Sequence, residues 1–247
     1  MKNWFESSSV RSRALGAAME RRECRRLCVS RALRWDAIAL LVSCGGAGLR
    51  ARRRRTWRST TDSNHTLPVA PNLLARPFNA TELNRAWGGD ITYLPTGQGW
   101  LDLAALIDLC SRRIIGWAMS DRLDQQLTLT ALEMAIGQRQ PGPHLIHHSD
   151  RGSQYAAHAY RNALTRIGAV QSMSRKGNCW ENAVSESFFS HLKAELLADA
   201  RFPTREQARS EVLRYLVWYN AERLHSTLGY ISPSRFEEER LTIPAVA

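Results

Sequence analysis

Three acidic residues of this 247-residue chain could act together on a metal ion: Asp90, Asp150 and Glu186. Asp90 lies inside a predicted strand, where aspartate is uncommon because it competes for backbone hydrogen bonds and is costly to bury. Asp150 ends another predicted strand, at the edge of a sheet where active sites are often built. Glu186 lies on a predicted helix. Taken singly, each of the three is more often structural than catalytic.

The combination of two strand carboxylates and one helix carboxylate is more informative than its parts. Carboxylate oxygens are the ligands that Mg²⁺ prefers, and the ion keeps coordination positions open for phosphate and water. Two such ions, roughly 3.5–4 Å apart, can activate an attacking oxygen and stabilise the leaving oxygen of an in-line phosphoryl transfer. This chemistry needs no Ser or Tyr nucleophile. The three acids therefore predict a site that binds a pair of divalent cations.

The elements that must position these acids follow from hydrophobic patterning and turn residues. Strands are predicted at 87–94, 100–109, 113–119, 145–149 and 170–173, the first three as an antiparallel meander, and helices before Pro141 and at 155–167, 181–198 and 204–222. Gly137 suits the position just after the first helix, and Thr204 with Gln207 forms a capping box for the last one. We predict an α/β fold: a ribonuclease-H-like mixed five-stranded sheet with flanking helices, followed by C-terminal helices.

The excess of positive charge is confined to the N-terminal quarter. Residues 1–60 contain 15 Lys and Arg against 4 Asp and Glu, whereas residues 61–247 contain 19 of each. The run of Arg52, Arg53, Arg54 and Arg55 is typical either of a solvated basic linker or of an arm that follows DNA phosphates. We predict a poorly structured basic segment at 1–60, a linker at 61–85, a catalytic core at 86–200 and a helical extension at 201–247.

Other features of the sequence bear on the compartment and on alternative metal sites. Five irregularly spaced cysteines favour reduced thiols in a cytoplasmic protein. We expect no membrane partner, because no apolar run is long enough to span a bilayer and no secretory signal is evident. His147 and His148 are adjacent on a strand and point to opposite faces, which favours a structural or DNA-facing role over a zinc pair. Asp102 and Asp108 are interpreted as structural or charge-tuning.

Several phrases of the sequence resemble those of one known family. They are Trp87-Gly-Gly-Asp-Ile-Thr-Tyr93, His148-Ser-Asp-Arg-Gly-Ser-Gln-Tyr155, Ser174-Arg-Lys-Gly-Asn-Cys-Trp-Glu-Asn182, Glu186-Ser-Phe-Phe189, Leu192-Lys193, Tyr219-Asn220, His225 and Leu228-Gly-Tyr-Ile-Ser-Pro233. The chain resembles the transposases of bacterial insertion sequences whose catalytic subunit carries the retroviral-integrase core. The 35 residues between the second and third acids, and Lys193 seven positions after Glu186, match that family's pattern. The match covers about residues 50–240.

The resemblance implies a mechanism, a cofactor and partners. Asp90, Asp150 and Glu186 would hold two Mg²⁺ or Mn²⁺ ions, water would cut one strand at the element's end, and the freed 3′-hydroxyl would attack a second phosphodiester. Lys193 would contact the DNA end near the scissile bond. The expected partners are the element's terminal repeats, target DNA, further copies of the chain on DNA and a helix-turn-helix subunit encoded in an upstream frame. Further DNA contacts are expected at Arg151, Arg175, Lys176 and Asn182, and in the arginine run at 52–55.

Residues 1–45 depart from the family's pattern, because the helix-turn-helix segment that usually precedes the core is not recognisable there. We hypothesise a frameshifted or truncated start, which the three reading frames of the upstream DNA would test. Two other functions stay open at this stage. One is an inactive remnant that only binds DNA, and the other is a host ribonuclease-H-like nuclease.

Overall fold

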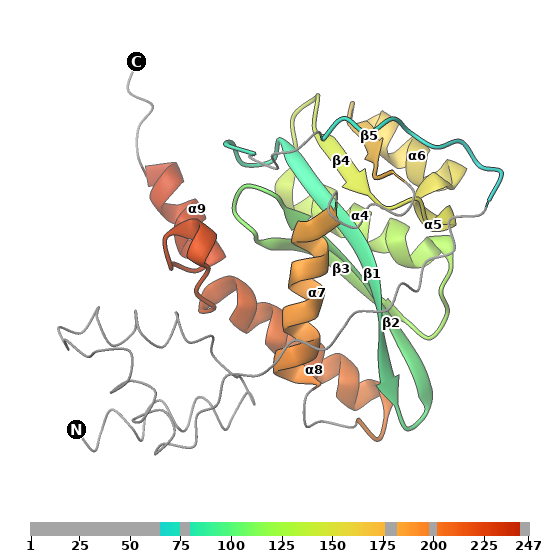
Figure 1. Cartoon of the computed structure of the whole chain (residues 1–247), viewed down its shortest axis with the longest axis vertical. Helices are drawn as coiled ribbons and strands as arrows, with labels where there is room; N and C mark the ends of the chain where they lie inside the picture. The colour runs from blue at the N-terminus through green and yellow to red at the C-terminus, as the bar shows by residue number, and fades with distance from the viewer. Residues whose placement is uncertain (1–64, 75–79, 176–181, 198–201, 243–247) are drawn as a thin grey trace.

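The computed structural model describes residues 65–74, 80–175, 182–197 and 202–242. The predicted N-terminal segment and the arginine run at 52–55 lie outside these ranges. The regular elements, in chain order, are β1 (Ala86–Thr96), β2 (Gly99–Asp108), β3 (Ile114–Ser120), α4 (Gln125–Arg139), β4 (Ile146–Ser149), α5 (Ser153–Ala156), α6 (His158–Arg166), β5 (Val170–Met173), α7 (Ala183–Leu196), α8 (Arg205–Ala221), the 3₁₀ turn η2 (Ser226–Leu228) and α9 (Pro233–Thr242) (Figure 1).

Five strands form one mixed sheet in the order β3-β2-β1-β4-β5. The strands β1, β2 and β3 pair antiparallel, as the short links between them predict, whereas β4 runs parallel to β1 and β5 runs parallel to β4. The fold class predicted from the sequence is thereby confirmed. Strand β1 lies at the junction, since it pairs with the antiparallel half on one side and the parallel half on the other.

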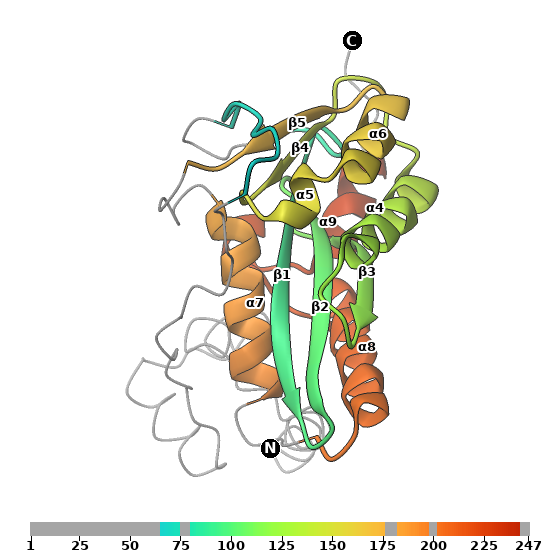
Figure 2. The ribbon, with the colours of Figure 1, turned by 90° about the vertical axis from the view of Figure 1, so that its right-hand side faces the viewer.

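Helices cover both faces of the sheet (Figures 1 and 2). Side chains alternate between the faces along β1, so that Leu94 belongs to a core with α7 and α8, whereas Trp87 belongs to a core with α4, α5 and α6. Both residues are fully buried. A sheet buried on both faces reads as nearly continuous apolar sequence, which explains why all ten residues from Leu101 to Cys110 are buried.

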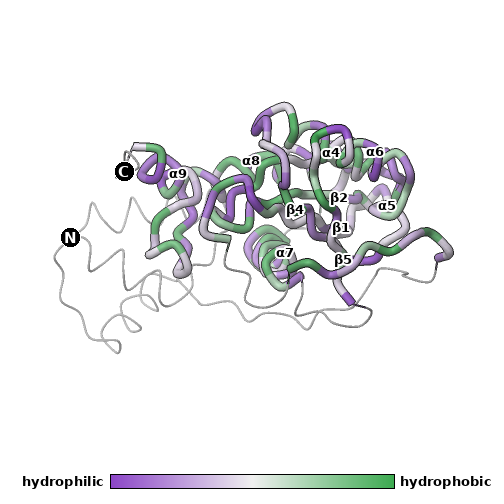
Figure 3. Tube along the Cα trace, turned by 90° about the horizontal axis from the view of Figure 1, so that it is seen from above, coloured by the Kyte–Doolittle hydropathy of each residue, from purple (hydrophilic) through white to green (hydrophobic). Residues whose placement is uncertain are grey.

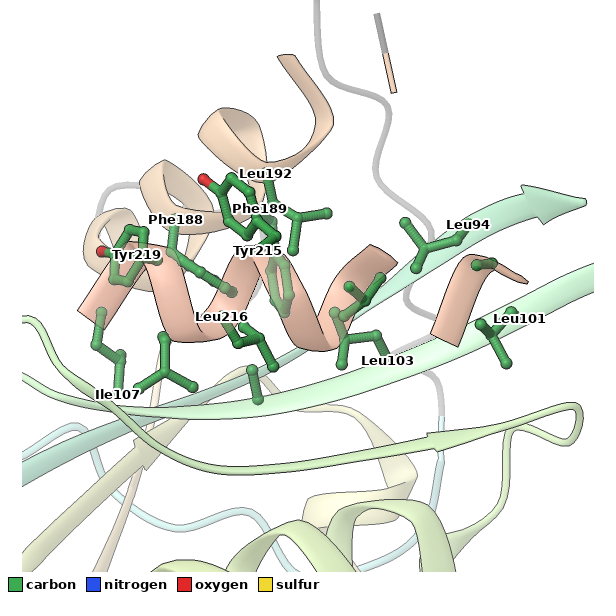
Figure 4. Packing of buried hydrophobic residues seen from close by; sticks show 14 of the residues in the cluster. Leu94, Leu101, Leu103, Ile107, Phe188, Phe189, Leu192, Tyr215, Leu216 and Tyr219 are labelled. Atoms are coloured by element: carbon green, nitrogen blue, oxygen red, sulfur yellow. The ribbon is translucent and has the colours of Figure 1, made fainter. Parts of the chain in front are cut away.

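Aromatic rings join α7 to α8 over the sheet. The ring of Phe188 packs edge-on against Tyr219, with centroids 4.9 Å apart, and lies 5.1 Å from the ring of Phe189. Figure 4 shows these rings, with Tyr215 and Leu192, stacked above the aliphatic side chains of the strands. The residues of α8 that face this core are Ala208, Val212, Tyr215, Leu216 and Tyr219. The helix opens as predicted, because Thr204 Oγ1 accepts a hydrogen bond from the backbone N–H of Gln207 at 3.2 Å.

The C-terminal helix α9 is anchored through one buried carboxylate. Most of its residues are hydrophilic (Figure 3), yet Glu237 is only 3% exposed. The Glu237 carboxylate accepts hydrogen bonds from Arg139 Nη1 at 2.9 Å, Arg113 Nη1 at 2.7 Å and Ser111 Oγ at 2.7 Å. These contacts attach α9 to the end of α4 and to the turn between β2 and β3.

Two helix boundaries differ from the prediction. Gly137 does not follow α4: the helix continues to Arg139, and Gln140 takes the left-handed conformation with φ of 42° while its N–H bonds to the Ile136 carbonyl. The predicted helix at 155–167 is two helices, since the extended conformation of Ala157 separates α5 from α6. Both differences depend on the backbone dihedral angles of a single residue, which the spacing of apolar residues does not predict.

Residues 71–73 of the predicted linker lie along β5. The backbone N–H of Leu73 donates to Ser172 Oγ at 2.9 Å, and the N–H of Met173 donates to the Pro71 carbonyl at 3.4 Å. His65 Nε2 lies 2.7 Å from the Arg151 carbonyl oxygen. Within the described ranges, none of the helices combines the length and the apolar character that a membrane-spanning segment needs.

Two glycines give a paired test of these element boundaries. A methyl group on Gly116 of β3 would overlap the Ala131 carbonyl oxygen and lie 2.8 Å from Ala135 Cβ, whereas one on Gly137 meets nothing within 4 Å. We predict that Gly116→Ala lowers the free energy of unfolding by about 1–3 kcal/mol. Gly137→Ala should raise it by about 0.5–1 kcal/mol, because alanine favours a helix interior. Chemical denaturation measures both, and a loss of stability in Gly137→Ala would contradict the observed course of α4.

Candidate active site

The strand register brings Asp90 and Asp150 to the same level of the sheet. In the parallel pair of β1 and β4, Gly89 lies opposite Ser149. The next residues along the two strands are Asp90 and Asp150. Neighbouring strands lie about 4.8 Å apart. Two carboxylates 60 residues apart in the sequence are thus placed side by side at the carboxyl end of β4.

Helix α7 brings Glu186 to the same face of β1. A Cβ atom on Gly88 would lie 2.8 Å from Ser185 Oγ, so α7 approaches β1 where the strand has no side chain. Asp90, two residues after Gly88, projects from the same face of the strand. Glu186 follows Ser185 in the first turn of α7 and is half-buried. A larger residue at position 88 would hold α7, and Glu186 with it, away from the sheet.

The charges of these residues act on one another. Burial raises the pKa of Asp90 well above its ordinary value, and repulsion from Asp150 and, more weakly, from Glu186 raises it further. The backbone N–H of Ile91 and the ammonium of Lys193 oppose that rise. Burial also raises the pKa of Glu186, and repulsion from Asp150 adds to it. Asp90 is only 5% exposed, so little solvent screens these interactions.

Lys193 is the cation of this group. Partial burial lowers the pKa of Lys193, while attraction to Asp90 raises it. Residues seven apart on a helix lie on one face, about two turns from each other. Lys193 is therefore on the same side of α7 as Glu186 and interacts with the strand carboxylate across the gap. The structure brings together four residues that the sequence singled out: Asp90, Asp150, Glu186 and Lys193.

Backbone hydrogen bonds orient both strand carboxylates. Asp90 Oδ1 accepts from the N–H of Ile91 at 2.8 Å, and Asp150 Oδ1 accepts from the N–H of Gly152 at 2.9 Å. The backbone after Asp150 is held as well, because Arg151 Nε donates to the Ser174 carbonyl at 2.8 Å. Each carboxylate thus has one oxygen engaged with the backbone.

The donor set fits a hard divalent cation, although the side chains are not gathered into a finished coordination sphere. Among residues 65–74, 80–175, 182–197 and 202–242, no group of three or more His, Cys, Asp or Glu side chains meets the geometry of a metal site. The carboxylate oxygens of Asp90, Asp150 and Glu186 are nevertheless ligands of the kind that Mg²⁺ prefers.

The other residues predicted to contact DNA are placed differently. Arg151 is half-buried, and Arg175 is exposed just after β5. Asn182 is buried at the start of α7 and makes no side-chain cap. Lys176 and the arginine run at 52–55 lie outside the described residues.

The two adjacent histidines and Asp108 of β2 have structural surroundings. His147 Nε2 lies 2.8 Å from the Tyr160 hydroxyl, and His148 Nδ1 lies 2.9 Å from Ser172 Oγ. Burial lowers the pKa of His147 to about 3, so its ring is neutral. Asp108 accepts hydrogen bonds from the backbone N–H groups of Asn84, Cys110 and Ser111. These hydrogen bonds are those expected of the structural alternative for both histidines and for Asp108.

Tyr155 is a neighbour of the site to which sequence reasoning assigned no role. Its ring packs beneath β1, 3.4 Å from the position of a Cβ on Gly89. Burial raises its pKa well above the ordinary value, and the charges of Asp90 and Asp150 contribute. Its hydroxyl has no hydrogen-bond partner within the described part of the chain. The only signal in the sequence was its place five residues after Asp150 in the motif.

Comparison with known proteins gives matches over most of the chain. Two family models, both described as Integrase core domain, match residues 80–179 and 168–233. The insertion element IS600 uncharacterized 31 kDa protein of Shigella sonnei is 48% identical over 192 residues, covering 77% of this chain and 71% of the relative. Transposase InsF for insertion sequence IS3A of Escherichia coli is 45% identical over 195 residues, covering 78% of this chain and 68% of the relative.

The fold is similar to that of a solved nucleoprotein assembly. A chain of the simian T-cell lymphotropic virus intasome, determined by cryo-electron microscopy in complex with PP2A regulatory subunit B56 gamma, superimposes with a TM-score of 0.55. The likeness covers 85% of this chain and 67% of that chain, at 17% sequence identity. It supports the architecture: a mixed five-stranded sheet with helices on both faces.

Repulsion at Asp90 predicts an unusual effect on stability. Because the raised pKa makes ionisation of Asp90 costlier in the folded chain, its contribution to stability is full below about pH 4 and is lost as the pH rises through the raised pKa. Without divalent metal at neutral pH, Asp90→Asn should therefore raise the Tm, by roughly 2–4 °C for each kcal/mol of repulsion relieved. Thermal unfolding of both proteins across pH checks this. A Tm difference that does not grow with pH would contradict it.

Proposed function

The chain belongs to the family of insertion-sequence transposases that carry an integrase core domain, and we propose that Asp90, Asp150 and Glu186 are the metal-binding residues at which it cuts and joins DNA. A transposase of this family is a polynucleotidyl transferase: it exchanges one phosphodiester bond for another. The assignment is supported above all by the surroundings of Asp90. This carboxylate is buried, the negative charges of Asp150 and Glu186 repel it, and the positive charge of Lys193 attracts it.

The proposed cofactor is a pair of Mg²⁺ or Mn²⁺ ions. When bound, divalent cations supply activation of the attacking oxygen and stabilisation of the leaving oxygen. Asp90 and Asp150 would hold them from the rigid strands, and Glu186 would close the site from α7. Their mutual repulsion supports this, because a cation between them removes the cost of ionising Asp90.

The residues around the triad have supporting roles in the proposal. The backbone N–H groups of Ile91 and Gly152 each donate to one carboxylate oxygen, of Asp90 and Asp150 respectively, and so orient the two side chains. Lys193, half-buried and on the same face of α7 as Glu186, would bind the phosphate of the DNA end. The proposed reaction uses water and then a DNA 3′-hydroxyl as nucleophiles, so no side chain of the site needs to form a covalent bond to DNA.

The partners remain proposals. We assign the terminal repeats of the element and target DNA as substrates, and further copies of the chain as partners on DNA. A helix-turn-helix subunit from an upstream reading frame would supply recognition of the ends. We also propose four parts of the chain: a basic segment at 1–60, a linker at 61–85, a core at 86–200 and an extension at 201–247. The proposed compartment is the cytoplasm.

The two alternatives are not favoured. A host ribonuclease-H-like nuclease fits poorly with relatives that are insertion-element proteins at 45–48% identity. An inactive remnant would not be expected to keep all three carboxylates and Lys193 close enough for their charges to act on the buried Asp90. The function supported best is that of a DNA transposase.

Neutral variants of the triad test the assignment. Asp150→Asn and Glu186→Gln should each reduce cleavage and joining of DNA bearing the element's ends by roughly 1000-fold or more in Mg²⁺, since several kcal/mol of transition-state stabilisation is lost. DNA binding should persist. Glu206→Gln is a matched control, because Glu206 is an exposed acid in the first turn of α8 as Glu186 is in that of α7. If either triad variant joined DNA as well as the unaltered protein does, the assignment would be wrong.

Lys193 gives a separate prediction about the DNA end. Lys193→Ala should weaken binding of end DNA and reduce the slope of log affinity against log salt by about 1, as expected for one lost phosphate contact. Lys193→Arg should restore most of the binding. Arg214→Ala, at an exposed position on α8, is the control. Equal salt slopes for Lys193→Ala and the unaltered protein would remove the proposed contact.

A further inference from the structure

A buried ion pair joins the far end of α7 to the chain just after α8. Arg223 Nη2 donates to Glu195 Oε1 at 2.9 Å, and Arg223 Nε lies 3.2 Å from both carboxylate oxygens. The Tyr215 hydroxyl donates to Glu195 Oε2 at 2.7 Å. Glu195 is 6% exposed and Arg223 4%. Both oxygens of the carboxylate are therefore engaged by groups from the C-terminal extension.

A buried ion pair contributes little net stability to a fold. Removing two charges from water costs several kcal/mol for each ion, which their attraction offsets only in good geometry, and apolar replacements are often as stable. The neighbouring contacts between α7 and α8 are apolar and aromatic already, as between Phe188 and Tyr219. Hydrogen bonds from Arg223 and Tyr215 to one carboxylate depend on direction, so they add to the apolar interface a contact that is favourable in only one orientation of the helix.

That direction matters because of where the acids lie around α7. At about 100° per residue, Glu186 and Lys193 lie within about 20° of each other around the helix axis, and Glu195 lies about 180° from Glu186. The buried stripe of Ser185, Phe188, Phe189 and Leu192 runs between these two edges. Any rotation of α7 that moves Glu195 from Arg223 moves Glu186 and Lys193 by the same angle relative to Asp90.

We propose that Glu195, Arg223 and Tyr215 form a clamp that positions the catalytic helix. The clamp fixes the rotation of α7 and its position along its axis, so that Glu186 and Lys193 reach the strand carboxylates. The C-terminal extension is thereby a part of the active site's support. This inference rests on the proposed function, in which Glu186 is a metal ligand. All three clamp residues act through α7 and are positioning residues.

A second buried ion pair in the same molecule serves as a matched control. Glu237 on α9 is bound by Arg139, Arg113 and Ser111 and is as deeply buried as Glu195. Its partners lie on α4 and on the turn between β2 and β3. None of these contacts involves α7. Losing the charge of Glu237 should therefore destabilise the fold without turning the catalytic helix.

The experiment compares Glu195→Gln with Glu237→Gln in the full chain, using the Mn²⁺-induced rise in Tm as a measure of metal binding independent of turnover. Both variants should have a lower Tm than the unaltered protein in the absence of metal. Glu195→Gln should need about tenfold more Mn²⁺ for half of the Tm rise, a loss typical of residues that orient metal ligands. Glu237→Gln should need the same concentration as the unaltered protein within about twofold. Strand joining should follow the same Mn²⁺ dependence.

Further variants keep the test decisive. If Glu195→Gln does not fold, Tyr215→Phe, which removes a single contact, should show a smaller shift of the same kind. A double variant, Glu195→Met with Arg223→Met, should recover Tm but not the Mn²⁺ affinity, because apolar contacts restore packing without direction. The clamp is overturned if both glutamine variants alter the Mn²⁺ requirement equally or if neither does. The proposed function fails separately, if Asp90→Asn keeps the full Mn²⁺-induced rise.

Discussion

Repulsion among carboxylates at the junction of β1 and β4 is the constraint around which the structure is arranged. The parallel register that sets Gly89 opposite Ser149 places Asp90 and Asp150 side by side, and α7 adds Glu186 to them. A fold does not gather three acids in a buried place at no cost. In the proposed function a divalent cation would relieve that cost, so that the arrangement that destabilises the metal-free chain would prepare it to bind the metal and to act on a phosphodiester.

The rest of the molecule supports this placement from two sides. One core, with α4, α5 and α6, fixes the strands that carry the aspartates, and the other, with α7 and α8, carries the helix with the third acid. A strand position is fixed by many backbone hydrogen bonds, whereas a helix on an apolar surface can turn. The Glu195–Arg223 pair supplies the directional contact that the apolar core lacks. Rigid strands and a clamped helix together define the site.

Much of this could be predicted from the sequence, because the informative signals were local. Apolar runs bounded by turn residues located the five strands, and Asp90 stood out as a polar residue within one of them. The end of α4 at Gln140 and the break at Ala157 were missed, since both depend on a single backbone conformation. The clamp was not predictable, because Glu195 looks like an ordinary helical glutamate until the fold brings Arg223 to it from 28 residues away.

The most direct test of the central claim is a crystal structure of the full chain grown with Mn²⁺, with diffraction recorded at the manganese absorption edge. The account predicts anomalous density between the carboxylates of Asp90, Asp150 and Glu186, and its loss in crystals of Asp150→Asn. Manganese bound elsewhere, with the three carboxylates left apart, would contradict the claim that these acids form the metal site of the transposase.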